Sequence, residues 1–254
     1  MADRPVPSRS SPRRFERQFA RMPALGALLY DWLAGRPRTM AIHFAEVARV
    51  LAGGRERGRL LDVGTGPGRL LREIHNANPA IELYGLDISP AMVRRARRNL
   101  AGVPVDLRAE SISHTTHESD FFDVVTATGS FYLWGDPAAG LREIHRVLVP
   151  GGTAHLFEPD AETSEADLRT IAVALRRETL PRRLIGPMFI RTAVRAGLRA
   201  SELAEVLDHS PFAGAARVER ITLAGISIWL HIALTKQAGR VTGPAPGGGT
   251  TLQP

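Results

Sequence analysis

The middle of the chain alternates short apolar runs with segments of helical periodicity. Residues 60–63, 81–86, 103–108, 122–128 and 153–157 each have the length and composition of a buried strand. Apolar positions spaced as in amphipathic helices lie at residues 69–77, 90–99 and 137–148. This alternation predicts an α/β fold with a mostly parallel, doubly wound sheet. Two further segments around Gly225, at 218–223 and 227–234, predict two more strands, which would give a seven-stranded sheet.

Two helices are predicted before the first strand. Helical periodicity begins near Phe15 and continues to Leu33, with a break or kink expected at Pro23. A second helix is expected to start at Thr39 as its N-cap and to end at the glycine pair at 53–54. Both ends of the chain, 1–14 and 239–254, are poor in large apolar residues and rich in proline and small or charged residues, so we expect them to be disordered.

A mostly helical segment, 161–212, follows the fifth predicted strand. Helices are expected at 165–178, 189–196 and 201–207, with breaks at Pro181 and at Gly186-Pro187. We therefore predict one domain over residues 15–238, with this segment as a helical cap that is mobile and selects the substrate. The alternative is a rigid side layer of the core.

Composition narrows the classes of function. The chain has 254 residues and no cysteine, which excludes disulfides, thiolate metal sites and a cysteine nucleophile. No apolar run approaches the ~18 residues of a membrane span, so we expect a soluble, cytoplasmic protein. The formal charge of +7 suggests a nucleic-acid partner, but Lys236 is the only lysine among 33 basic residues. This arginine bias, with abundant alanine, glycine and proline, is what a GC-rich genome produces whatever the function, and many arginines have the spacing of a solvated helix face.

A glycine-rich turn separates the first strand from the helix that follows it. Gly64, Gly66 and Gly68 occupy alternate positions, and glycine allows a ligand to approach the backbone. The free N–H groups of the following helix would point towards such a ligand. A dinucleotide fingerprint starting at Gly64 would need glycine at position 69, where the chain has Arg69. The second strand ends in Asp87, whose carboxylate could accept hydrogen bonds from both hydroxyls of a ribose, or could simply cap a helix.

The spacing Asp62-x-Gly64-x-Gly66-x-Gly68 resembles the first motif of the class I S-adenosylmethionine (SAM) methyltransferases of the small-molecule type. The stretches 122–125, 134–137 and 145–152 look like the successive downstream motifs of that family, and the similarity runs from about residue 58 to 160. The resemblance implies a Rossmann-like fold closed by an antiparallel C-terminal hairpin. It also implies SAM as cofactor and two N-terminal helices that roof it.

The same resemblance assigns roles to single residues. It implies that Asp62 orients the turn or the methionine ammonium, that Asp87 binds the ribose, and that Ile88 packs on the adenine. Thr128 would flank the methionine, and Tyr30 of the Tyr30-Asp31 pair would lie near SAM, unless it only packs on the core. The residues expected to bind the cofactor are Tyr30, Asp62, Gly64, Thr65, Gly66, Pro67, Gly68, Asp87, Ile88, Glu110, Ser111 and Thr128.

Two positions depart from the family pattern. Many relatives carry Gly-Asp after the third strand to read the adenine amino group, whereas this chain has Ala109-Glu110-Ser111. Either Glu110 or Ser111 could take that role. Pro67 stands where many relatives have a hydrogen-bonding residue, which removes one backbone N–H from the turn.

Tyr132 and Glu158 are the candidate catalytic residues, because they follow the fourth and fifth strands at the carboxyl edge of the sheet. Tyr132 could instead line the acceptor pocket, and Glu158 could be a solvent-exposed carboxylate. His43 could face the pocket, and no His/carboxylate spacing suits a metal. We expect methyl transfer to O, N or C of a small apolar or aromatic acceptor. The pocket would include Tyr132, Trp134 and the cap residues Leu184, Ile185, Met188 and Phe189, although core packing could explain the same residues.

Two other functions remain compatible with these patterns. The charge favours an RNA or rRNA methyltransferase, but no base-stacking motif is evident. A SAM-binding regulatory protein without transfer activity would carry the same cofactor motif.

Overall fold

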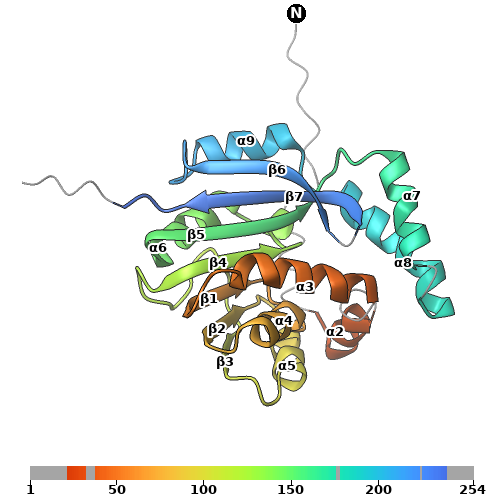
Figure 1. Cartoon of the computed structure of the whole chain (residues 1–254), viewed down its shortest axis with the longest axis horizontal. Coiled ribbons are helices and arrows are strands. Elements are labelled where there is room, and N and C mark those ends of the chain that lie inside the picture. Colours follow the sequence, from red (N-terminus) through yellow and green to blue (C-terminus); the bar gives the residue numbers. More distant parts are fainter. Residues whose placement is uncertain (1–21, 33–37, 176–177, 224, 239–254) are drawn as a thin grey trace, which may run out of the picture.

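A computed structural model describes residues 22–32, 38–175, 178–223 and 225–238, and it forms a seven-stranded sheet with helices on both faces (Figure 1). The strand order is β3-β2-β1-β4-β5-β7-β6. All neighbouring pairs from β3 to β5 are parallel, and β7 is antiparallel to both β5 and β6. The predicted seven-stranded doubly wound sheet with its antiparallel hairpin is therefore confirmed.

The strands lie close to their predicted positions. They are β1 (Gly58–Val63), β2 (Ile81–Leu86), β3 (Val105–Arg108), β4 (Phe122–Thr128), β5 (Leu148–Pro159), β6 (Ala216–Leu223) and β7 (Ile226–Thr235). The fifth strand starts five residues before its predicted start at 153. The glycines at 151–152 do not end the pairing, because the register shifts between Phe122 and Val124 and accommodates the extra residues.

Helices cover the sheet in two layers. Helices α3 (Arg38–Ala52), α4 (Arg69–Ala77) and α5 (Pro90–Asn99) pack on one face, together with α7 (Glu165–Ala174). Helices α6 (Pro137–Val147) and α9 (Ala200–Asp208) pack on the other. The connection from β3 to β4 contains no helix and is a loop, as predicted. Helix α2 (Ala24–Tyr30) and helix α8 (Leu180–Arg195) gather with α7 at one end of the sheet (Figure 1).

The cap differs from its prediction mainly in its middle helix, which was expected at 189–196. Residues 180–195 form one helix that runs through Gly186-Pro187, so the break expected there is wrong. Pro181 lies in the first turn of α8. Backbone N–H groups in the first turn have no hydrogen-bond partner within the helix, so proline costs no hydrogen bond there. The predicted helices at 165–178 and 201–207 are found as α7 and α9, the first of them shorter than expected.

Several predictions about the ends of the chain lie outside the described residues. These concern the predicted disorder of 1–14 and 239–254 and the helical positions Phe15, Phe19 and Leu33. Helix α2 begins directly after Pro23, which agrees with the predicted break. Helix α3 begins at Arg38, one residue before the predicted cap Thr39. In the part of the chain that the structure covers, no helix is long and apolar enough to cross a membrane.

Candidate functional site

The three glycines after β1 have different neighbours, although all three have positive φ, at +71°, +52° and +76°. A Cβ on Gly64 would lie 2.5 Å from the Cβ of Ser130, and a Cβ on Gly68 would lie 2.7 Å from Leu100 Cδ1. A Cβ on Gly66 would meet nothing closer than the Gly64 carbonyl oxygen at 3.9 Å. Gly64 and Gly68 are therefore required by packing, whereas Gly66 faces open space.

Asp87 fixes the glycine turn to the end of β2. Its Oδ2 accepts a hydrogen bond from the Gly66 N–H (2.9 Å) and its Oδ1 accepts one from the Ser89 N–H (2.8 Å). Each carboxylate oxygen keeps a free lone pair for a ligand hydroxyl. Burial raises the pKa of Asp87 to about 6, and burial also raises the pKa of the neighbouring Asp62 to about 7.

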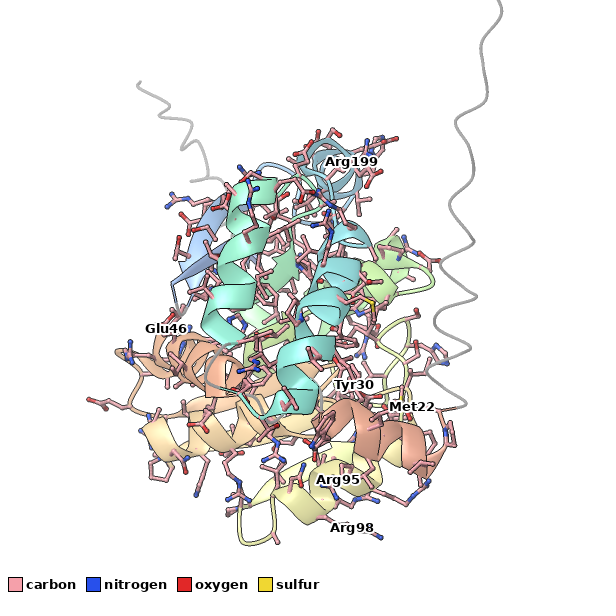
Figure 2. The ribbon with its side chains drawn as sticks, turned by 90° about the vertical axis from the view of Figure 1, so that its right-hand side faces the viewer. Met22, Tyr30, Glu46, Arg95, Arg98 and Arg199 are labelled. Atoms are coloured by element: carbon pink, nitrogen blue, oxygen red, sulfur yellow. The ribbon has the colours of Figure 1, made fainter. Side chains whose placement is uncertain are left out.

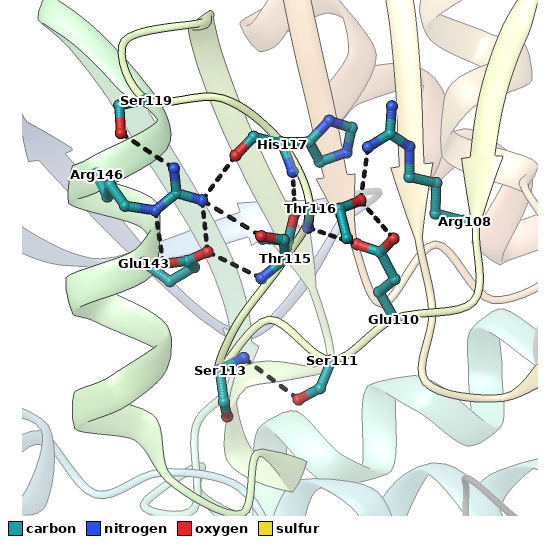
Figure 3. Close-up of polar contacts among 10 residues, drawn as sticks. All are labelled: Arg108, Glu110, Ser111, Ser113, Thr115, Thr116, His117, Ser119, Glu143 and Arg146. Atoms are coloured by element: carbon teal, nitrogen blue, oxygen red, sulfur yellow. Dashed lines mark hydrogen bonds and ion pairs between the residues drawn. The ribbon is translucent and has the colours of Figure 1, made fainter.

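A network of polar contacts holds the loop after β3, and the carboxylate of Glu110 is part of that network (Figure 3). Glu110 accepts hydrogen bonds from the Thr116 N–H (3.0 Å) and the Thr116 hydroxyl (2.7 Å). Ser111 accepts one from the Ser113 N–H at 3.2 Å. Arg146 of α6 anchors the far end of the loop by donating to the His117 carbonyl (2.8 Å) and to the Ser119 hydroxyl (3.1 Å). This loop is therefore ordered without a helix.

Glu158 lies at the end of β5 and has no exposed surface, so the alternative of a solvent-exposed carboxylate is wrong. Its Oε1 accepts hydrogen bonds from the N–H groups of Ser130 (3.1 Å) and Phe131 (3.0 Å). Its Oε2 accepts a longer one from the Tyr132 N–H at 3.4 Å. Burial raises the pKa of Glu158 to about 8, and burial also raises the pKa of the Tyr132 hydroxyl. Glu158 thus holds the turn that carries Tyr132.

Helix α2 reaches the site through Tyr30 and is held by Asp31. The Asp31 carboxylate is fully buried and accepts hydrogen bonds from Arg69 Nε (3.0 Å) and Arg95 Nε (2.8 Å). These ion pairs join the end of α2 to α4 and α5. The Tyr30 ring contacts Phe189 of α8 edge to face, with 6.3 Å between centroids, and burial raises the pKa of its hydroxyl to about 12.

These elements line a pocket that is open to solvent. Seven of the predicted cofactor residues line it: Tyr30, Gly64, Gly66, Asp87, Ile88, Glu110 and Ser111. The predicted acceptor residue Trp134 lines it as well.

Most of the apolar wall was not predicted from the sequence. Met92, Ile112 and Leu133 line the pocket together with Val63 and Leu86 at the ends of β1 and β2. Met92 is the third residue of α5, which begins three residues after Asp87, so its place on the first helical turn was a usable signal. Leu133 lies in a 3₁₀ turn, Phe131–Leu133, for which no periodic pattern exists.

The remaining predicted residues lie behind or beside the pocket lining. Asp62 and Thr65 are buried beneath the turn, and Pro67 contributes its carbonyl oxygen to the Asn99 side-chain amide (2.8 Å). Gly68 begins α4. Thr128, Tyr132 and Glu158 lie at the ends of β4 and β5, next to the lining residues Gly129 and Ser130.

Other side chains suggested for the site lie elsewhere. The His43 ring stacks on Trp229 at 4.3 Å between centroids and does not line the pocket. The cap residues Leu184, Ile185 and Met188 are 68%, 42% and 66% exposed, and none of them lines the pocket. Within the described ranges, no cluster of three or more His, Asp or Glu side chains could hold a metal ion.

Two features of the pocket fit a nucleoside cofactor with an amino-acid end. The buried Thr128 hydroxyl has no hydrogen-bond partner among the described residues, and it lies at the end of β4 beside the lining residue Gly129. Gly66 leaves space over the turn that a side chain would fill. A ligand with polar groups at both places would satisfy the hydroxyl and occupy the space.

Comparison with known proteins agrees with this geometry. Residues 60–152 match the family model described as a methyltransferase domain. An uncharacterized methyltransferase of Bacillus subtilis, YdaC, is 30% identical over 111 residues, which are 44% of this chain and 61% of that protein. A demethylmenaquinone methyltransferase of Deinococcus radiodurans is 34% identical over 102 residues, which are 39% of this chain and 42% of that protein. The chain thus covers less than two thirds of the length of these relatives.

Solved structures extend the likeness to the whole fold. A SAM-dependent methyltransferase from Aquifex aeolicus superposes with a TM-score of 0.57 at 16% identity, covering 90% of this chain and 100% of the other. The plantazolicin methyltransferase BpumL, in complex with S-adenosylhomocysteine, gives a TM-score of 0.62 at 15% identity, covering 89% and 95%. Residues 60–152 therefore match a methyltransferase domain, and the chain has the Rossmann-like fold that these SAM-dependent methyltransferases share.

Proposed function

We propose that this methyltransferase domain moves a methyl group from SAM to a small apolar or aromatic acceptor. The observation that carries the proposal is the pocket at the carboxyl ends of β1, β2 and β4, where Gly66 leaves the turn open and Asp87 offers both oxygens. In doubly wound sheets, nucleosides bind at this edge, next to the switch in strand order between β1 and β4.

The lining suggests how the chain would hold the cofactor. Asp87 would accept hydrogen bonds from the two ribose hydroxyls, and Ile88, Met92 and Leu133 would pack on the adenine. Ser111 would read the polar edge of the adenine, because the carboxylate of Glu110 is already bonded to Thr116. Asp62, beneath the turn, would add negative charge at the methionine end of the site.

SAM supplies an electrophilic methyl group on a sulfonium, whose departure leaves a neutral thioether. The protein therefore mainly needs to align the acceptor and exclude water. Glu158 would act as a positioning residue, since it holds the N–H groups of the 130–132 turn. Tyr132 stays protonated at neutral pH because burial raises its pKa, so it would donate a hydrogen bond to the acceptor.

The proposed class of acceptor is supported by the aromatic residues that line the pocket and by the names of the relatives. Trp134 and Tyr30 line the pocket, and aromatic walls suit flat apolar rings. Matching relatives include several demethylmenaquinone methyltransferases and a ubiquinone/menaquinone biosynthesis C-methyltransferase of Geobacter sulfurreducens, 35% identical over 108 residues. These names favour a ring compound of the quinone type as the acceptor.

Calorimetry with SAM, S-adenosylhomocysteine and NAD tests cofactor use. The wild-type chain should bind the first two and not NAD, and Gly66→Val should abolish that binding because its side chain fills the open space over the turn. Gly214→Val is the matched control: Gly214 has φ +73° and open space around it, but lies in the turn before β6. Unchanged SAM affinity in Gly66→Val would overturn the proposed site.

Transfer itself is tested by incubating the protein with methyl-labelled SAM and a metabolite extract. Mass spectrometry should identify a small aromatic compound that gains the label. Tight SAM binding without a labelled product from any extract would instead favour a SAM-binding regulatory protein.

A further inference from the structure

We propose that helices α2 and α8 form a surface that docks on an anionic phospholipid membrane. The surface consists of large apolar side chains that face solvent in the described part of the chain: Leu25, Leu28 and Leu29 on α2, and Leu180, Leu184, Ile185 and Met188 on α8. Their exposed fractions run from 42% at Ile185 to 75% at Leu25. We call these seven residues the α2–α8 face.

The two helices are neighbours, so their apolar side chains belong to one surface. Tyr30 at the end of α2 and Phe189 of α8 are in ring contact, and Figure 2 shows both helices on the same side of the molecule. On its inner side α2 packs through Ala27 on Ala91 and Met92 of α5. The opposite side of α2, with Leu25, Leu28 and Leu29, is left to solvent. Clustered exposed apolar side chains of this kind mark interaction sites.

The exposed charges that α5 and α8 add around the face are positive. The sequences of α2, α5 and α8 contain no Asp or Glu, and α5 and α8 carry four arginines each, of which Arg95, Arg191 and Arg195 are paired with Asp31 or Glu165. Arg94, Arg98 and Arg183 are exposed. Figure 2 shows Arg98 on the same side of the molecule as Tyr30. Apolar side chains flanked by arginines match the apolar interior and the anionic headgroups of a phospholipid surface.

The arginines also favour an anionic membrane over a second copy of the chain as the partner of this face. A second copy of the chain would bring α5 and α8 of both copies together and place cationic helices opposite each other, which costs energy. Anionic headgroups are complementary to those helices and release counterions on contact. Tyr30 belongs to α2 and also lines the pocket, so a membrane on this face would lie beside the roof of the pocket. The docking surface goes beyond the proposed methyl transfer and is tested without any reaction.

Because the chain has no cysteine, a single introduced cysteine labels one position cleanly. The full-length chain with Leu184→Cys is labelled with a polarity-sensitive fluorophore and mixed with vesicles of phosphatidylcholine, with or without phosphatidylglycerol. We expect a blue shift with the anionic vesicles only, and its loss in high salt. Val50→Cys is the matched control, since Val50 is 51% exposed near the end of α3 that leads to β1 and should not respond.

Vesicle flotation of unlabelled variants tests both components of the surface. Arg94→Ala with Arg98→Ala should weaken binding by about thirtyfold, because each basic residue near an anionic surface contributes roughly a factor of five. Leu184→Glu with Met188→Glu should abolish flotation, and Val50→Glu should leave it unchanged. SAM binding and the melting temperature are followed in all variants, so that loss of folding or of the cofactor site is recognised separately.

Three results would overturn the docking surface. A blue shift that grows with protein concentration in the absence of vesicles would assign the face to a second copy. A shift already present at high dilution, and unchanged by vesicles, would assign it to another segment of the same chain. Equal flotation on neutral and anionic vesicles, or flotation that survives the Leu184→Glu and Met188→Glu changes, would exclude this face. SAM binding is independent of all three, so the proposed function would stand.

Discussion

Burial changes the acid–base behaviour of the three carboxyl groups at the edge of the sheet. Burial raises the pKa values of Asp87, Asp62 and Glu158 to about 6, 7 and 8. All three groups therefore exchange protons near neutral pH, where ordinary carboxyl groups are fully ionised. A cation bound beside them favours the ionised forms and lowers the same pKa values.

The first prediction is a pH dependence of opposite sign for stability and for cofactor affinity. Each folded-state pKa lies above its unfolded value, so the stability contribution of these groups is complete below about pH 4. It is lost progressively as pH rises from about 4 through the folded values of about 6, 7 and 8. The affinity for SAM, which carries a sulfonium, should rise over the same window. Urea unfolding and calorimetry at pH 5.5, 6.5, 7.5 and 8.5 measure both quantities.

S-adenosylhomocysteine is the control for this prediction because it lacks the sulfonium charge. Its affinity should rise less steeply with pH, and SAM binding near pH 7 should release protons in buffers of different ionisation enthalpy. Equal pH profiles for the two ligands would show that the carboxyl groups do not sense the sulfonium.

The second prediction concerns Asp87→Ala, which removes the acceptor for two backbone N–H groups and for the ribose. SAM affinity should fall by roughly 1.5–3 kcal/mol, the scale of hydrogen bonds to a charged group. The melting temperature should fall as well, because the N–H groups of Gly66 and Ser89 lose their partner. Asp87→Asn keeps one oxygen acceptor and should lose less of both. A variant with lower stability but unchanged SAM affinity would make Asp87 a structural cap only.

At the residue scale, the sequence predicted the glycine turn but not the different role of each glycine in it. The spacing of the glycines predicted a cradle, yet only the structure separates Gly66 from Gly64 and Gly68, because their neighbours Ser130 and Leu100 are distant in sequence. The choice between Glu110 and Ser111 likewise depended on Thr116, a partner within a loop that has no periodic pattern.

At the element scale, Asp31 determines where α2 lies. Its carboxylate is fully buried between Arg69 of α4 and Arg95 of α5, which are 27% and 17% exposed. The hydrogen bonds from the two arginines outweigh burial and hold the pKa of Asp31 below its usual range. The adjacent residue, Tyr30, is a wall of the pocket, so these ion pairs also position that wall.

The third prediction is that Asp31→Asn loosens α2 and weakens SAM binding. Removing one partner of a buried ion pair costs up to about 3–5 kcal/mol, and the partly exposed arginines should reduce that cost. Hydrogen exchange of residues 24–30 should speed up, and SAM affinity should fall through Tyr30. Asp106→Asn is the control, since Asp106 pairs with Arg108 on the surface at 42% exposure and should cost no more than about 1 kcal/mol. Unchanged SAM affinity would leave Asp31 with a purely structural role.

Helix α8 shows why local signals fail for the cap. Gly186-Pro187 is typical of a break, yet a Cβ on Gly186 would lie 2.9 Å from Leu175 Cδ1, so the glycine lets α8 approach the end of α7. Tertiary packing therefore explains the glycine, and the proline removes only one backbone hydrogen bond. The sequence shows both residues, but it does not show the contact with Leu175 that explains the glycine within the helix.

At the scale of the whole molecule, the cap is buried against the core along only part of its length. Leu168, Ile171 and Leu175 are buried in the same cluster as the sheet, as is Val194 near the end of α8. The first nine residues of α8 carry Leu180, Leu184 and Met188 out to solvent. The two halves of the cap should therefore differ in local stability.

The fourth prediction follows from this difference and refines the expected mobile cap. Amide hydrogens of residues 168–175 should exchange slowly, like those of β1, while those of residues 183–188 should exchange quickly in the free protein. Adding SAM with an acceptor should slow exchange in 183–188. Exchange there as slow as in β1, with and without ligands, would make the whole segment a rigid side layer.

The sheet was predictable as a whole because its signal is local and repeated. Each parallel strand is a short apolar run, and the alternation with helices specifies the doubly wound class. The position of α2 and α8 was not predictable, because it depends on single contacts such as Tyr30 with Phe189 and Asp31 with Arg95. Leu184, Ile185 and Met188 of α8 were predicted to line the acceptor pocket, but they are exposed. Phe189 of the same helix contacts Tyr30.

The contact between Gly64 and Ser130 has a consequence for how such sequences vary in evolution. The Ser130 hydroxyl donates to the Val63 carbonyl oxygen (2.9 Å), and its Cβ occupies the space that a side chain at position 64 would need. The turns after β1 and β4 thus pack closely against each other, so positions 64 and 130 cannot change independently. Among descendants of the same ancestor, a larger residue at 64 should be found only where the turn at 130 has been rebuilt, so the two positions should change together.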